Sequence, residues 1–86
     1  MTADQLTLNQ SGKILEISSS PLKINLMELG FLPGKQLTLQ HRAPLGGPLA
    51  FQLEETLLAL RKNEAALIRI ELLSWSWLQK IFLKYI

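Results

Sequence analysis

Two clusters of glycine and proline, one on each side of an alternating segment, constrain this chain most. The first cluster is Gly30-Phe-Leu-Pro-Gly34 and the second is Pro44-Leu-Gly-Gly-Pro48. Glycine adopts positive φ at no steric cost and proline fixes φ near about −65°, so each cluster predicts a chain reversal rather than a linker. Between the clusters, residues 36–43 alternate, with Leu37 and Leu39 on one face, as in a half-buried strand. This spacing predicts a small, tightly turned β structure.

Four further segments have the length and residue types of short strands. They are residues 13–17, 49–53, 56–61 and 67–72. We expect Leu15 and Ile17 to share the buried face of the first. The Leu-rich segment 56–61 is expected to be buried on both sides.

One short helix is predicted after the first strand. Ser20 is a suitable N-cap and Pro21 a suitable first helical residue, and Gly30 can end the helix after Leu29 in a left-handed conformation. The fold class is therefore mainly β: a small five-stranded barrel of SH3 type with one short helix after its first strand.

Residues 73–86 have a helical rather than a strand period. Trp75, Leu78, Phe82 and other apolar residues fall on one face, and polar residues occupy the other. We therefore divide the chain into a barrel domain, residues 1–72, and an appended amphipathic helix, residues 73–86. Three roles remain open for this helix: it folds back on the barrel, it contacts a partner or a second copy, or it lies on a membrane surface.

Composition narrows the class of protein. The 86 residues suffice for one domain, cysteine is absent, and nine Lys and Arg stand against seven Asp and Glu. These charges are scattered, whereas nucleic-acid binding usually requires a clustered basic stripe. The chain begins without the features of a signal peptide and has no apolar run of membrane-spanning length. We expect a soluble, cytoplasmic protein that does not bind nucleic acid.

Catalytic and metal-binding patterns are missing from the sequence. The single histidine, His41, is expected on the Leu37/Leu39 face and has no second histidine or cysteine with metal-ligand spacing, although a transient metal contact stays open. No Ser-His-Asp or Cys-His arrangement can be built, and residues 30–36 lack the spacing of a phosphate-binding loop. We predict a non-enzymatic protein without catalytic, cofactor-binding or metal-binding residues.

Three ordered segments carry a family resemblance: residues 29–34, 42–48 and 58–65. At these spacings the chain resembles the ferrous iron transport protein A (FeoA) family, over residues 6–72. The resemblance implies a small bacterial cytosolic protein with an SH3-like barrel. It also implies an accessory role in ferrous iron uptake, through binding to the GTP-hydrolysing membrane transporter FeoB.

A protein of this kind is expected to act through a binding surface. The expected partner-binding residues come from the two turn clusters and the C-terminal helix: Phe31, Leu32, Leu45, Gly46, Gly47, Pro48, Trp75, Trp77 and Phe82. Self-association is left open, as is peripheral contact with the inner membrane through residues 73–86. The alternative is a regulatory SH3-like domain that responds to metal or is linked to nucleic acid.

Overall fold

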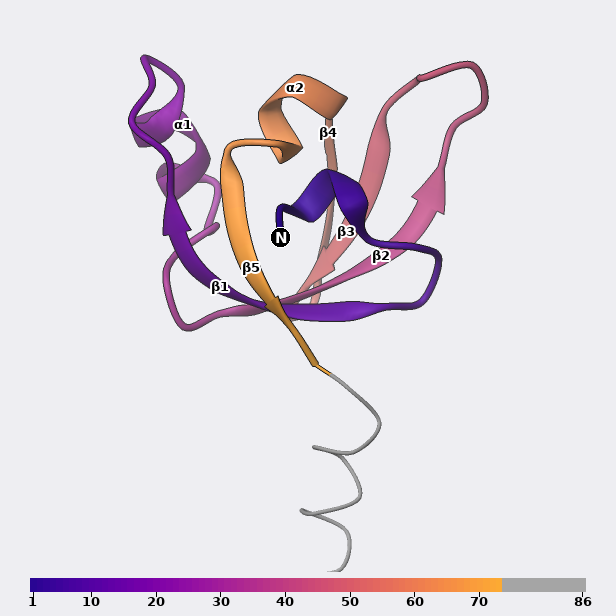
Figure 1. The fold of residues 1–86 in the computed structure, drawn as a ribbon, viewed down its shortest axis with the longest axis horizontal. Helices are drawn as coiled ribbons and strands as arrows, with labels where there is room; N and C mark the ends of the chain where they lie inside the picture. The colour runs from indigo at the N-terminus through magenta and orange to yellow at the C-terminus, as the bar shows by residue number, and fades with distance from the viewer. Residues whose placement is uncertain (74–86) are drawn as a thin grey trace, which may run out of the picture.

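The computed structural model describes residues 1–73, which form one curled antiparallel sheet (Figure 1). The strand order is β4-β3-β2-β1-β5, and all four pairings are antiparallel. The elements are η1 (Ala3–Gln5), β1 (Ser11–Ile17), α1 (Lys23–Glu28), β2 (Gln36–Arg42), β3 (Leu49–Leu53), β4 (Thr56–Leu60), α2 (Lys62–Ala65) and β5 (Ile68–Leu72). The expected helix over residues 73–86 lies outside the described residues, apart from Leu73.

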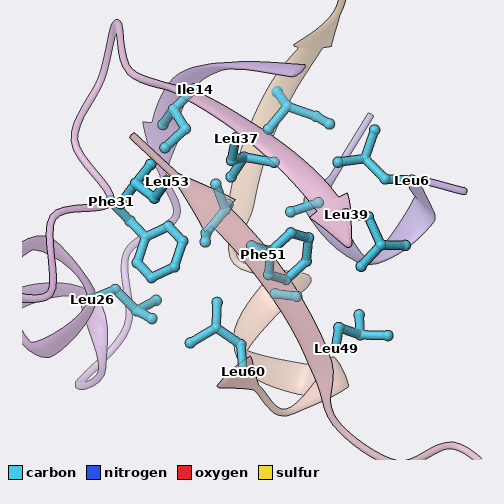
Figure 2. Close-up of a cluster of buried hydrophobic side chains, with 14 of the residues drawn as sticks. Leu6, Ile14, Leu26, Phe31, Leu37, Leu39, Leu49, Phe51, Leu53 and Leu60 are labelled. Carbon is cyan, nitrogen blue, oxygen red and sulfur yellow. The ribbon is translucent and has the colours of Figure 1, made fainter. Parts of the chain in front are cut away.

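The curl of the sheet encloses a single apolar core (Figure 2). Phe51 of β3 lies at its centre, and Leu37, Leu39, Leu49 and Leu60 converge on it from the strands. Every buried side chain in the described part of the chain is apolar. None of the helices within residues 1–73 is long and apolar enough to cross a membrane.

Both turns of the first glycine and proline cluster form as predicted. Gly30 has φ +110°, its N–H bonds to the Met27 carbonyl at 3.0 Å, and the Phe31 N–H bonds to the Leu26 carbonyl at 3.1 Å. This pair of bonds is the Schellman helix terminator, in which glycine takes the left-handed position. Gly34 has φ +90°, and the Lys35 N–H bonds to the Leu32 carbonyl, as in a type II turn. Helix α1 begins at Lys23, slightly later than the Pro21 start that we expected.

A β-bulge changes the buried face of β1. Ile14 pairs with Ile70 and Glu16 with Arg69, so Leu15 is an extra residue without a partner on β5. As a result Ile14 and Ile17 are buried, while Leu15 is 44% exposed. The expectation that Leu15 faces the core is wrong, because a strict period of two does not survive a bulge.

A second bulge turns His41 out of the core. Leu39 pairs with Phe51 but His41 pairs with Ala50, which leaves Gln40 as the extra residue on β2. His41 is exposed and does not share the buried face of Leu37 and Leu39, contrary to our expectation.

Strand β4 lies at the edge of the sheet instead of its interior. It pairs with β3 alone, and Leu57 is 59% exposed. Only Leu60 is fully buried, and Leu58 is partly buried against the core. The prediction of burial on both sides is therefore wrong: leucine content alone does not distinguish a central strand from an apolar edge.

Candidate functional site

The loop between β2 and β3 is a tight reversal at the end of a long hairpin (Figure 1). The Ala43 N–H bonds to the Pro48 carbonyl at 3.0 Å, and the Gly47 N–H bonds to the Pro44 carbonyl at 3.2 Å. Leu45 and Gly46 occupy the two central positions of this turn, with φ +60° and +72°. Positive φ at both positions is the type I′ geometry, which fits the twist of a hairpin. We call residues 43–48 the hairpin tip.

Leu45 is the most unusual residue of the hairpin tip. A left-handed backbone is unfavourable for leucine, and its side chain is 104% exposed, so no packing within the described chain offsets this strain. Leucine is not a residue that this turn position prefers, and the exposure of its apolar side chain to water is also unfavourable. Strained residues of this kind concentrate at functional sites, and an exposed apolar side chain at a loop end is suited to insertion into a partner.

A surface hollow of about 620 Å³ lies beside the hairpin tip. It is lined by Gly46, Gly47 and Pro48 on one side and by the α2 region on the other. The remaining lining residues are Asp4, Arg61, Lys62, Asn63 and Ala66. The lining thus combines apolar residues with two cations and one carboxylate.

Sequence reasoning missed the α2 side of this hollow. Residues 62–66 form helix α2 and its C-cap, and none of them was among the residues expected to bind a partner. The adjacent basic pair Arg61-Lys62, placed directly after an apolar strand, was the available signal. The sequence alone does not show that this pair lies, in the folded chain, beside a loop some fifteen residues earlier.

The remaining predicted site residues do not join the hairpin tip. Phe31 is 0% exposed and packs in the core near Leu26 and Leu53 (Figure 2), so its side chain is not available to a partner in this conformation. Leu32 is 37% exposed and borders a separate hollow of about 260 Å³ with Leu29 and Leu53. Trp75, Trp77 and Phe82 lie outside the described residues, and their role stays a prediction.

Within residues 1–73 no three His, Cys, Asp or Glu side chains are grouped so that they could hold a metal ion. The two ion pairs within this part of the chain, Lys35–Glu54 and Arg69–Glu16, are largely exposed and lie away from the hollow.

Comparisons with known proteins agree on one family. A family model described as the FeoA domain matches residues 1–72. A curated relative from Porphyromonas gingivalis, the Fe(2+) transport protein A/Fe(2+) transporter FeoB fusion protein, is 37% identical over 49 residues. That match covers 57% of this chain but only 6% of the fusion protein.

Two solved structures of FeoA proteins are similar to this chain over most of their length. The NMR structure of a FeoA-like protein from Clostridium acetobutylicum has a TM-score of 0.81 and 28% identity, covering 86% of this chain and 87% of that one. The crystal structure of Stenotrophomonas maltophilia FeoA complexed with zinc, described as a prokaryotic SH3 domain protein, has a TM-score of 0.74 and 29% identity. It covers 83% of this chain and 89% of the other. The predicted five-stranded, SH3-like architecture is confirmed.

Proposed function

Because the chain belongs to the FeoA domain family, we propose that it is a non-enzymatic cytoplasmic accessory protein in bacterial ferrous iron uptake. It supports the transporter FeoB by binding its cytosolic region through the hairpin tip. Support for this partner comes from the Porphyromonas gingivalis relative, in which a segment similar to this chain and a FeoB transporter belong to one fusion protein. Family membership by itself supports only the link to ferrous iron transport.

Leu45 is the single observation that carries the choice of surface. Its side chain is fully exposed on a strained turn, so burying it in a partner removes apolar area from water without breaking any contact within residues 1–73. Burial of a leucine side chain is worth about 1.5–3 kcal/mol. Arg61 and Lys62 line the hollow beside the hairpin tip, so they favour a partner that offers an apolar pocket next to acidic groups.

The direct test is retention of the transporter by the full-length chain. The chain is immobilised, detergent-solubilised FeoB from the same bacterium is passed over it, and binding is measured by surface plasmon resonance. We expect Leu45→Gly to weaken binding by about tenfold or more, because it removes the side chain and keeps a residue that suits the turn. Lys62→Glu is expected to weaken binding and to reduce its dependence on salt.

Leu15→Thr is the matched control, since Leu15 is an exposed leucine on β1 that does not line the hollow. It is expected to leave binding unchanged. Failure of the wild-type chain to retain FeoB would reject the proposed partner. Equal retention of wild type and Leu45→Gly would reject the hairpin tip as the docking surface. A nucleic-acid mobility shift at moderate salt, in place of FeoB binding, would favour the regulatory alternative.

A further inference from the structure

The two edge strands of the sheet, β5 and β4, differ in whether another segment of the described chain pairs with them. At the β5 edge the N-terminal segment is paired: Thr2 forms a bridge with Arg69, and the Ile70 N–H bonds to the Met1 carbonyl at 2.9 Å. Figure 1 shows this segment beside β5. At the β4 edge, no backbone group of Leu57 or Ala59 bonds to any described residue outside β3. Within residues 1–73, the covered edge is therefore β5 and the open edge is β4.

Strand β4 also lacks the usual protection of an exposed edge. Its sequence, Thr-Leu-Leu-Ala-Leu, contains no charge and no proline, and its pairing with β3 runs without a bulge. Soluble proteins normally place a charge, a proline or a bulge on an open edge strand, because an unprotected edge can pair with a strand of another chain. Leu57 is 59% exposed and Ala59 is exposed, so the side chains at this edge are accessible as well.

The hairpin between β3 and β4 determines which groups face outward. Glu54 and Glu55 form a two-residue loop, so Leu53 and Thr56 are its closing pair. Backbone groups of an antiparallel strand point alternately to its two sides. Thr56, Leu58 and Leu60 therefore direct their N–H and C=O groups to β3. Those of Leu57 and Ala59 point to the open side.

Opposite charges flank the apolar strand at equal distance from its centre. Glu55 precedes β4 and Arg61 follows it, each three residues from Leu58. Neither side chain forms an ion pair within residues 1–73. In an antiparallel pair related by a two-fold axis at Leu58, Glu55 of one copy lies opposite Arg61 of the other, twice per dimer.

From this symmetry we infer that β4 is a homodimerisation edge, which pairs antiparallel with β4 of a second copy about a two-fold axis at Leu58. In this register Leu57 lies opposite Ala59 of the second copy. These are the residues whose backbone groups point outward, so each such pair can exchange two hydrogen bonds. The same register covers the exposed Leu57 side chain. Pairing with a second copy therefore provides hydrogen bonds for the outward backbone groups, covers the exposed apolar side chain and pairs the opposite charges.

The test reverses the charge at position 55 or at position 61 and measures dimerisation of the full-length chain by sedimentation equilibrium. We expect a concentration-dependent dimer in the wild type. Glu55→Arg and Arg61→Glu should each raise the dissociation constant by about tenfold or more, because each places like charges opposite one another twice. Mixing the two variants should restore dimers, since both cross-strand pairs of the mixed dimer then join a basic side chain of one variant to an acidic side chain of the other.

A second variant tests the edge itself. Leu57→Lys places a charge on the open edge at an exposed position and should also produce monomers. Leu15→Lys, an equal change at an exposed leucine of β1, should leave the dimer intact. In the wild type, the Leu57 and Ala59 amides should exchange more slowly with deuterium as concentration rises.

Three results would overturn the inference. A wild-type chain that stays monomeric at millimolar concentration has no such interface. A dimer that survives Leu57→Lys, or whose charge variants fail to recombine on mixing, uses another surface. Protection of the Leu57 and Ala59 amides that is independent of concentration would mean that the chain covers this edge itself. None of these measurements involves FeoB, so they stand or fall separately from the proposed function.

Discussion

Gly12 of β1 lies so close to Ile70 of β5 that a Cβ built on Gly12 would stand 2.7 Å from Cδ1 of Ile70. The Cβ of Ile70 would be 3.2 Å away, and Ile70 itself is 2% exposed, so its side chain has little room to move. Gly12 is therefore a strand residue at which a side chain has no room. Its lack of a side chain leaves the space that the Ile70 side chain occupies.

Gly12→Ala is accordingly expected to lower the free energy of unfolding by about 1–3 kcal/mol through overpacking. Urea denaturation followed by circular dichroism measures this change. Ile70→Val removes the Cδ1 atom that the new methyl group meets. The double variant should therefore lose less than the sum of the two single variants. Strict additivity would show that the cost of Gly12→Ala does not come from this contact.

Phe31 and Leu32 are adjacent in the sequence but differ in role. Phe31 is fully buried where α1 ends, and Leu32 is 37% exposed. We expect Phe31→Ala to cost about 3–5 kcal/mol of unfolding free energy, as for other buried aromatic residues. Leu32→Ala is expected to cost less than about 1 kcal/mol. Equal losses in thermal or urea unfolding would contradict the assignment of Phe31 to the core.

Leu45 is expected to contribute no stability to the isolated protein. Leu45→Gly relieves a left-handed backbone and removes no contact, but glycine gains entropy in the unfolded chain. These effects oppose each other, so unfolding free energy should stay equal or rise by up to about 1 kcal/mol.

Gly46→Ala is the matched change at the next position of the same turn. Its φ is +72° and no atom lies within 4 Å of the added Cβ, so only the backbone is affected. We expect a loss of about 1–2 kcal/mol. A larger loss for Leu45→Gly than for Gly46→Ala would show that Leu45 has a structural role, which would weaken its assignment to partner binding.

Local backbone chemistry is the part of this fold that the sequence predicts well. Gly30 and Gly34 take the left-handed positions expected of them, and residues 49–53 form a strand with the predicted bounds. The predictions that failed concern residues whose environment is determined by strands or loops distant in the sequence. The exposure of Leu15 and His41 follows from bulges, which are defined only by the strand opposite. The edge position of β4 follows from sheet order, and the hollow beside the hairpin tip follows from the return of α2 to that loop.

Arg42 connects the end of β2 to the segment that covers β5. Its guanidinium donates hydrogen bonds to the Leu6 carbonyl at 2.6 Å and to the Asp4 carbonyl at 3.2 Å. Arg42→Met keeps most of the aliphatic stem and removes these bonds, so the N-terminal segment should open more often. The Ile70 amide, which bonds to the Met1 carbonyl, should then exchange with deuterium about five- to tenfold faster.

The Gly34 amide provides the internal control for this variant, because it bonds to the Ile14 carbonyl at 2.7 Å, and neither Gly34 nor Ile14 belongs to the N-terminal segment. Local opening of residues 1–6 exposes Ile70 but leaves this bond closed. We therefore expect the exchange rate of the Gly34 amide to be nearly unchanged in Arg42→Met. If both amides accelerate equally, Arg42 stabilises the whole fold and does not specifically hold the N-terminal segment against β5. If neither accelerates, the hydrogen bonds of Arg42 contribute nothing to covering this edge, and the pairing of Met1 and Thr2 with β5 is sufficient alone.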